Sequence, residues 1–293
     1  MNKKYAYQSP IIVAEIGCNH MGEMSIAKEL VDLAKAAHAN YAKFQKRYPK
    51  ELLTEEQYKA PHPYQPYSFG DTYGSHREFL EFTQEEHRVL KDYCQKVGIG
   101  YATSVWDSSS AEEIISLNPD YIKVPSACNM HFEMLEILRD SYQGDVHISI
   151  GMTTREEEKK IVKFFQENQN THRLVLYACT SGYPVPFEDA NLLEIDRLQK
   201  SYGEQVKAIG FSGHHLGIAI DQAAYTLGAT WIERHFTKDR TWKGTDHAAS
   251  LELGGLQKLV RDLSATYKAL QYKPKEILDI ESIQRDKLKY RKS

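Results

Sequence analysis

Tyr41-Ala-Lys-Phe-Gln45 and Tyr121-Ile-Lys-Val-Pro125 are two short runs in which a lysine lies near the end of an apolar segment. Aromatic and β-branched residues of this kind favour a β-strand. Similar runs recur along the chain, and amphipathic helical patterns separate them, which is typical of parallel βα units. The fold is therefore expected to be built on a parallel sheet with helices packed against it.

Eight strands are predicted in this alternation. They are Ile11–Glu15, Ala42–Gln45, Tyr101–Ser104, Tyr121–Val124, Val146–Ser149, Leu174–Ala178, Ala208–Phe211 and Trp231–His235. Capping-box patterns predict helix starts at Thr83–Glu86, Ser109–Glu112 and Thr153–Glu156. A last helix is expected from about Gly255 to Leu270. This count favours an α/β fold of the closed (β/α)8 TIM-barrel type, with an open eight-stranded sheet as the alternative.

The length of 293 residues suits one such barrel as a single domain, over residues 1–272. The segment from Lys46 to Phe82 is too long for a plain barrel loop, and such segments are usually functional lids or disordered insertions. Residues 273–293 are mixed in charge. They are expected to form a solvated, partly helical C-terminal tail.

Composition excludes several classes of protein. Hydrophobic residues make up 41% and charged residues 26%, which is enough for a substantial core, and the net charge of −3 argues against nucleic acid or an anionic membrane as partner. No apolar stretch approaches the roughly 18 residues of a transmembrane helix, and Met1–Pro10 lacks the apolar core of a signal peptide. Four cysteines without disulfide-type spacing indicate a reduced, cytoplasmic compartment.

Polar residues follow or end every predicted strand, at the end of a barrel where catalytic groups gather. Each of them alone is compatible with a surface or capping role, but their presence at all eight strand ends indicates an active site. The set comprises Glu15, Lys43, Gln45, Thr103, Ser104, Lys123, Ser126, Ser149, Thr180, Ser181, Tyr183, Ser212, His214 and His235.

Lys43 and Lys123 are the residues that point most directly to a type of ligand. A lysine that far into a core needs an anionic partner, so Lys43 and Lys123 either form core salt bridges or bind an anionic ligand. Together with the serine hydroxyls they suit a small anion that carries a phosphate and a carboxylate. A Schiff-base lysine is a competing interpretation, because barrel aldolases place one at a strand end.

His214 and His235 end consecutive strands, which lie about 4.8 Å apart in a sheet. They are therefore predicted to share one divalent metal ion with open positions for water and substrate; the alternative is a chance pairing among the twelve histidines. Glu15 is a candidate general acid or base beside that metal. Asp246 either holds a sugar hydroxyl or is a loop residue in an Asx-turn.

The same segments resemble the catalytic barrel of the sialic acid (N-acetylneuraminate) synthases, from about Ile11 to Leu270 and in the same order. The segments that carry the resemblance are Ala14-Glu-Ile-Gly-Cys-Asn-His20, Ala42-Lys-Phe-Gln45, Thr72-Tyr-Gly-Ser-His76, Cys179-Thr-Ser-Gly-Tyr-Pro184, Gly210-Phe-Ser-Gly-His214, Glu233-Arg-His-Phe-Thr237 and Thr241-Trp-Lys-Gly-Thr-Asp-His247. Three of them, Thr72–His76, Cys179–Tyr183 and Thr241–His247, are most similar to the branch that makes 9-phosphates from 6-phosphosugars.

The resemblance implies a transferase that condenses phosphoenolpyruvate with a mannose-type aldose, giving a nonulosonic acid and phosphate. Mn2+ would be its cofactor, with Co2+ or Mg2+ as alternatives, on His214 and His235. Glu15, Gln45, Tyr183 and Asp246 would face the acceptor or handle protons. The expected ligands of phosphoenolpyruvate are Lys43, Ser104, Lys123, Ser126, Ser149, Ser181 and Ser212.

Two departures from that family concern the acceptor side. The chain is expected to lack the family's C-terminal antifreeze-like domain, which supplies an arginine to the partner subunit. The segment Ser126-Ala-Cys-Asn129 is one residue shorter than the family's Ser-Gly-x-x-Asn-Asn motif. A homodimer is nevertheless expected. The rival interpretations are a Schiff-base pyruvate aldolase and a carbohydrate-binding barrel without catalysis.

Overall fold

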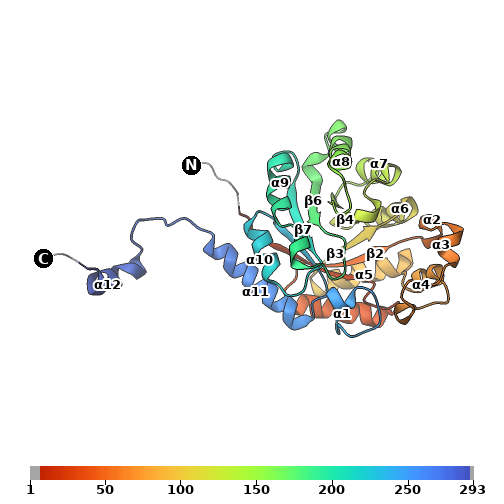
Figure 1. Ribbon diagram of the computed structural model, residues 1–293, viewed down its shortest axis with the longest axis horizontal. Helices are drawn as coiled ribbons and strands as arrows, with labels where there is room; N and C mark the ends of the chain where they lie inside the picture. Colours follow the sequence, from red (N-terminus) through yellow and green to blue (C-terminus); the bar gives the residue numbers. More distant parts are fainter. Residues whose placement is uncertain (1–6, 291–293) are drawn as a thin grey trace.

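The computed structural model describes residues 7–290, and its strands close into one parallel barrel in the order β1 to β8 (Figure 1). The strands are β1 Ile11–Gly17, β2 Tyr41–Lys46, β3 Gly100–Val105, β4 Tyr121–Val124, β5 Asp145–Ser149, β6 Leu174–Cys179, β7 Ala208–Gly213 and β8 Trp231–His235. All eight predicted strands are confirmed, and pairing of β1 with β8 settles the choice between a closed barrel and an open sheet.

Helices follow the strands and form the outer layer of the barrel (Figure 1). They are α1 Met24–Ala36, α5 Gln84–Val97, α6 Ser108–Leu117, α7 Phe132–Ser141, α8 Arg155–Glu167, α9 Leu193–Tyr202, α10 Ala219–Thr226 and α11 Leu253–Ala269. The last of these confirms the helix expected near Gly255–Leu270. Short 3-10 turns lie at η2 Ser126–Cys128, η3 Thr171–Arg173, η4 Phe187–Ala190 and η5 His247–Ala249.

Of the three predicted capping boxes, only the one at Thr83 is confirmed as predicted. Helix α6 is capped by the carboxylate of Asp107, which accepts from Ser110 N at 2.7 Å and thereby takes the place expected for Ser109. Helix α8 begins one residue later than predicted, after Thr154. The Thr153 hydroxyl is not free to cap, because it donates to Gly151 O and accepts from Asn129.

The two halves of the barrel interior differ in polarity. Near the amino ends of the strands, Tyr121, Tyr177 and Trp231 pack with small apolar residues into a closed floor. The rings of Tyr121 and Trp231 meet edge to face at 5.4 Å between centroids. Because this floor fills the lower half, the polar side chains that surround a cavity inside the barrel lie towards the carboxyl ends of the strands.

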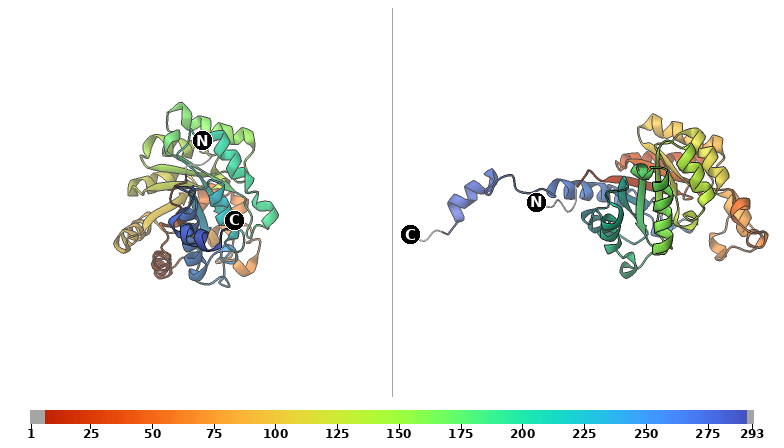
Figure 2. Two further views of the ribbon diagram at one scale, coloured as in Figure 1. Left: turned by 90° about the vertical axis from the view of Figure 1, so that its left-hand side faces the viewer. Right: turned by 90° about the horizontal axis from the view of Figure 1, so that it is seen from above.

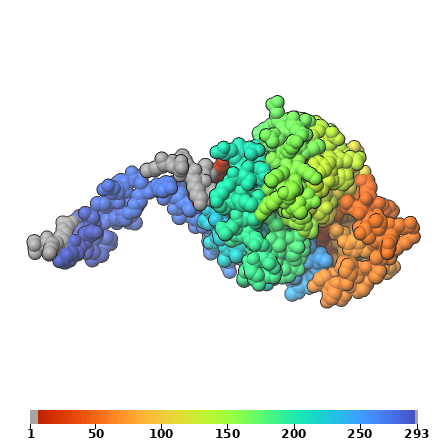
Figure 3. All heavy atoms as spheres, turned by 45° about the horizontal axis from the view of Figure 1, so that its top comes forward, coloured from red at the N-terminus to blue at the C-terminus, as the bar shows by residue number. Residues whose placement is uncertain are grey.

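The insertion between β2 and α5 is an ordered lobe at one side of the barrel, coloured orange in Figures 2 and 3. It contains α2 Pro49–Leu52, α3 Glu55–Lys59, η1 Gln65–Tyr67 and α4 Tyr73–Phe79. Close packing holds it together: a Cβ on Gly74 would lie 2.3 Å from the ring of Tyr58. Of the two expectations for this segment, a disordered insertion is wrong.

After α11 the described chain runs away from the barrel and ends in α12, Asp279–Leu288 (Figure 1). The tail and the insertion lie at opposite ends of the molecule (Figure 2). The tail is thus exposed and partly helical, as expected, over its described part. Among residues 7–290, no helix has the length and apolarity needed to cross a bilayer.

Candidate active site

A cavity of about 320 Å3 opens at the carboxyl ends of the strands. Its walls include every residue of the predicted site except Thr103, Thr180 and Asp246. The predicted residues in its lining are Glu15, Lys43, Gln45, Ser104, Lys123, Ser126, Ser149, Ser181, Tyr183, Ser212, His214 and His235, and the additional ones are Trp106, Pro125, Ala127, Met152, Cys179 and Glu233. Side chains from all eight strands or their following loops therefore converge on one space.

Lys43 is the centre of the first polar group in this cavity. Its ammonium forms an ion pair with Glu15 and donates to Ser104 Oγ at 2.8 Å. Gln45 donates to the other carboxylate oxygen of Glu15 at 2.8 Å. Strand register explains the contact, because Glu15 and Lys43 are directly paired on β1 and β2.

Lys123 belongs to a second group, which is centred on Glu233. The Glu233 carboxylate forms an ion pair with Lys123, accepts from Ser212 at 2.9 Å and lies 3.6 Å from Lys43 Nζ. Lys43 and Lys123 therefore form core salt bridges, which was one of the two interpretations. They also line the cavity, as the other interpretation, binding of an anionic ligand, requires. Four buried charges, two of each sign, form one network.

Glu233 was not among the predicted site residues. The signal was present in Trp231-Ile-Glu-Arg-His235, where Glu233 shares the inward face of a strand with Trp231 and His235. The outward Arg234 has its own partners, since it forms an ion pair with Asp221 at 2.5 Å beneath α10. The adjacent charges Glu233 and Arg234 therefore point to opposite sides of the barrel wall.

The charge states of this network follow from its contacts. Burial opposes ionisation of Glu233, but Lys123 and Lys43 hold the pKa of its carboxyl well below the ordinary value. Burial also opposes the charge on Lys43, yet Glu15 and Glu233 raise the pKa of its ammonium. For Lys123 burial prevails and the pKa is lowered, although Glu233 acts against it.

Replacement of Glu233 tests this network. We expect Glu233→Gln to lower the free energy of unfolding by about 3–5 kcal/mol, because two buried ammonium groups would lose their shared counter-ion. Urea unfolding followed by circular dichroism measures the change. Glu113→Gln is the matched control, since its carboxylate is partly exposed and 3.5 Å from Lys46. Equal stability of the two variants would contradict the assigned network.

Serine hydroxyls line another wall of the cavity. The Ser126 Oγ accepts from Gly151 N at 3.0 Å, and the Ser126 hydroxyl also hydrogen-bonds to the Cys179 side chain. A Cβ on Gly151 would lie 2.6 Å from Ser126 Oγ and 2.8 Å from Ser181 Oγ, so both hydroxyls approach the same backbone point. Ser149 lines the cavity beside them. This wall offers hydrogen-bond donors to an anion.

Two of the strand-end threonines lie outside the site. Thr103 points away from the cavity, because it alternates with Ser104 along β3 and pairs with the outward Phe44. The Thr180 hydroxyl donates to Asp189 O at 2.8 Å, and the backbone carbonyl of Thr180 accepts from His214 Nδ1. Both are structural residues of the barrel wall.

His214 and His235 have the features that a divalent ion requires. Their ring centroids lie 5.3 Å apart. The Thr180 carbonyl accepts from His214 Nδ1 at 2.9 Å, so the other ring nitrogen keeps its lone pair. Burial and then the neighbouring His235 lower the pKa of His214 to about 3, which keeps the ring neutral. His235 Nδ1 is buried without a hydrogen-bond partner.

Asp246 adds a carboxylate to this pair. Its Oδ2 lies 3.8 Å from His235 Nδ1. Burial opposes its ionisation, but His235 and Thr245 hold the pKa of the carboxyl below its ordinary value. Within residues 7–290 no three His, Cys, Asp or Glu side chains form a complete metal site on their own. An ion held by the two histidines alone would keep open positions for water or substrate.

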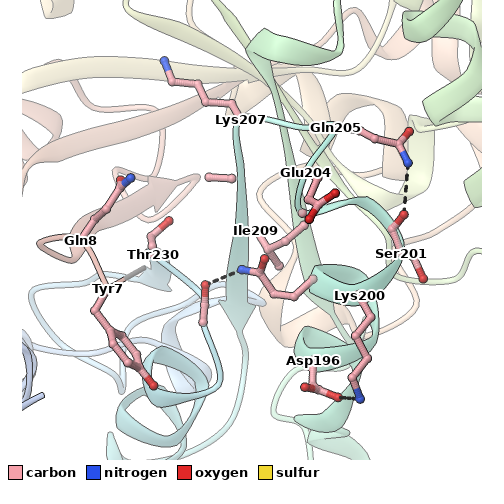
Figure 4. Close-up of a pocket in the computed structure, with 14 residues that line it drawn as sticks. Tyr7, Gln8, Asp196, Lys200, Ser201, Glu204, Gln205, Lys207, Ile209 and Thr230 are labelled. Carbon is pink, nitrogen blue, oxygen red and sulfur yellow. Dashed lines mark hydrogen bonds and ion pairs between the residues drawn. The ribbon is translucent and has the colours of Figure 1, made fainter. Parts of the chain in front are cut away.

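A larger cavity of about 570 Å3 lies at the opposite, amino-terminal end of the strands (Figure 4). Lys200 and Asp196 in its wall pair with each other at 2.5 Å, and Gln205 donates to Ser201 O at 3.3 Å. These four residues thus satisfy one another in two pairs. Catalytic groups of such barrels lie at the other end, so size does not make this groove the active site.

The chain is similar to known proteins over most of its length. The model of the NeuB family matches residues 30–275. The N-acetylneuraminate-9-phosphate synthase of Mus musculus is 38% identical over 278 residues, which cover 94% of this chain and 76% of that protein. The N,N'-diacetyllegionaminic acid synthase of Legionella pneumophila is 32% identical, with 90% of this chain and 75% of that protein covered. The crystal structure of the N-acetylneuraminic acid synthetase from Leptospira borgpetersenii in complex with citrate aligns with a TM-score of 0.80 and 29% identity, over 97% of this chain and 94% of that one.

Proposed function

This chain belongs to the NeuB family, and from that premise we propose that its cavity condenses phosphoenolpyruvate with a mannose-type aldose to form a nonulosonic acid. The observation that carries the proposal is the convergence of two lysines, five serines and a histidine pair on one cavity. The first two sets suit an anion with phosphate and carboxylate groups, and the histidines suit a Lewis-acid metal. The enzyme is a transferase of the sialic acid synthase type.

The donor, phosphoenolpyruvate, is proposed to bind between the lysines and the serine wall. Lys43 and Lys123 each carry three N–H donors, so the bonds to Glu15 and Glu233 leave donors free for the cavity. Before the donor binds, the two lysines and the two glutamates of the network balance in charge, and their ion pairs keep the ammonium groups in position. The proposed ligands are Lys43, Ser104, Lys123, Ser126, Ser149, Ser181 and Ser212.

In the proposed reaction C3 of phosphoenolpyruvate forms a bond to the aldehyde carbon, whose oxygen takes a proton and becomes a hydroxyl. Water adds to the oxocarbenium at C2, and phosphate then leaves as the 2-keto acid forms. Glu15 lies beside Lys43 and Gln45 and is the proposed group for these proton transfers. Gln45, Tyr183 and Asp246 are proposed to orient the acceptor.

A divalent ion, proposed to be Mn2+ with Co2+ or Mg2+ as substitutes, supplies polarisation of the aldehyde oxygen when bound. His214 and His235 would hold it. Tyr183 lies against His214, with 4.3 Å between ring centroids, and so borders the position of the reacting carbonyl. The acceptor is proposed to be mannose 6-phosphate or its N-acetylamino relative, and the compartment to be the cytoplasm.

Phosphate release tests this function directly. We expect the purified protein to release inorganic phosphate from phosphoenolpyruvate only when a mannose-type aldose is present. Borohydride reduction in the presence of pyruvate is the control for a Schiff-base aldolase, and it is expected to leave the protein mass unchanged. A pyruvate adduct on Lys123 or Lys43, together with no aldose-dependent phosphate release, would show that the protein is a Schiff-base aldolase and not a synthase.

The assembly is proposed to be a homodimer, the commonest symmetric oligomer. Sedimentation velocity at micromolar concentration is expected to give about twice the chain mass of 33.7 kDa. A single species of monomer mass under these conditions would rule the dimer out.

A further inference from the structure

A second cavity of about 190 Å3 adjoins the active-site cavity, and Trp106 and Ala127 line both. It lies where the loops after β2, β3 and β4 meet the insertion. The remaining lining residues are Arg47, Pro49, Leu52, Leu53, Arg77 and Cys128. Its volume is several times the roughly 30 Å3 that one water occupies in the liquid, so a tetrahedral anion fits in it.

Two arginines line this cavity, and the charge of Arg47 is balanced by a carboxylate of the protein. Its Nε donates to Glu81 Oε1 at 2.5 Å, and its terminal nitrogen donates to Cys18 Sγ at 2.6 Å. The side chain is almost fully buried. Arg47 is therefore fixed in place by these contacts.

Arg77 differs, because no carboxylate among residues 7–290 lies within ion-pair distance of it. Its guanidinium stacks on Tyr73 and Trp106, with 5.4 and 5.6 Å to the ring centroids. Burial and then Arg47 lower the pKa of this guanidinium. A cation that is held partly out of water beside another cation is costly unless an anion joins it.

The other cations of the insertion and of the end of β2 have partners, including Lys59, which pairs with Glu55 at 2.5 Å. Lys46 lies 3.5 Å from Glu113 and over the ring of Tyr48. Lys50 is exposed and lies 3.3 Å from Glu78. Neither lines the two cavities. The uncompensated charge of the insertion is thus concentrated at Arg77.

We propose that Arg77, positioned next to Arg47, binds the terminal phosphate of the acceptor sugar in this second cavity. This deepens the proposed function and rests on it. The shared wall at Trp106 and Ala127 allows an open-chain acceptor to keep its aldehyde end near His214 and His235 and its phosphate end at Arg77. A guanidinium suits this role, because its planar fork binds phosphate oxygens in pairs.

The test compares kcat/KM for a mannose-type aldose and for its 6-phosphate in four proteins: wild type, Arg77→Met, Arg77→Lys and Lys50→Met. We expect Arg77→Met to lower the ratio of phosphosugar to free sugar by about ten- to a hundredfold, because a charged hydrogen bond to substrate is lost. Arg77→Lys is expected to keep part of the preference for the phosphosugar, since lysine has the positive charge but not the planar guanidinium. Lys50→Met leaves the ratio unchanged.

Two readouts separate binding from a structural role. Titration calorimetry with the 6-phosphate alone is expected to show at least tenfold weaker binding to Arg77→Met than to wild type. The melting temperature of Arg77→Met is expected to equal or exceed that of wild type, because an uncompensated charge has been removed.

An equal loss of kcat/KM for both sugars, equal calorimetric affinities, or a wild-type preference for the free sugar would each overturn the phosphate subsite. Failure of the proposed function looks different. In that case wild type releases no phosphate from phosphoenolpyruvate with either sugar, whatever its affinity for the 6-phosphate.

Discussion

Removal of divalent metal is expected to lower the condensation rate at least about a thousandfold, since polarisation of a carbonyl by a metal stabilises the transition state by several kcal/mol. The site for the ion is inferred from His214 and His235, whose ring centroids lie 5.3 Å apart. Dialysis against a chelator followed by the phosphate-release assay measures the loss. Addition of Mn2+, Co2+ or Mg2+ is expected to restore the rate.

A matched pair of variants locates the ion. His214→Asn is expected to lose bound metal, as measured by elemental analysis, together with activity. His87→Asn is the control, because His87 is also buried but bonds to Tyr101 at 2.8 Å on the outer side of the barrel. Full activity of a protein shown to be free of metal would exclude the Lewis-acid role.

Lys123→Met is expected to weaken the binding of phosphoenolpyruvate at least about a hundredfold. Loss of one member of a buried charge pair costs about 3–5 kcal/mol, and each 1.4 kcal/mol is a factor of ten in affinity. The fold should survive this change, because Glu233 keeps Ser212 and lies 3.6 Å from Lys43. Isothermal titration with phosphoenolpyruvate in the absence of acceptor measures the affinity.

Lys207→Met is the control for this experiment. Lys207 forms an ion pair with Asp145 at the amino-terminal end of the barrel, far from the donor site in the fold. Its replacement is expected to leave the affinity within about twofold of wild type. A folded Lys123→Met protein with unchanged donor affinity would remove Lys123 from the donor site.

The sequence by itself determined the succession of elements and the chemical types at the strand ends. Alternation of short apolar runs and helical patterns is a local property, so all eight strands could be predicted, two of them to the residue, Tyr121–Val124 and Trp231–His235. Helix starts were less secure. Asp107 caps α6 in place of Ser109. Thr154 caps α8 because the Thr153 hydroxyl is engaged by Asn129, a contact across the fold.

Only the tertiary structure decided which charges meet. Lys123 and Glu233 are separated by 110 positions in the chain, and their pairing depends on the closure of the sheet and on the inward direction of Glu233. Closure likewise brings His235 on β8 into register with Glu15 on β1. Among residues 7–290 no carboxylate pairs with Arg77, for the same reason. Glu78 follows it directly in sequence, yet α4 turns Glu78 towards Lys50 and Arg77 towards Trp106. A helix separates adjacent side chains by about 100° around its axis, so charge partners are set by direction in space rather than by proximity in the chain.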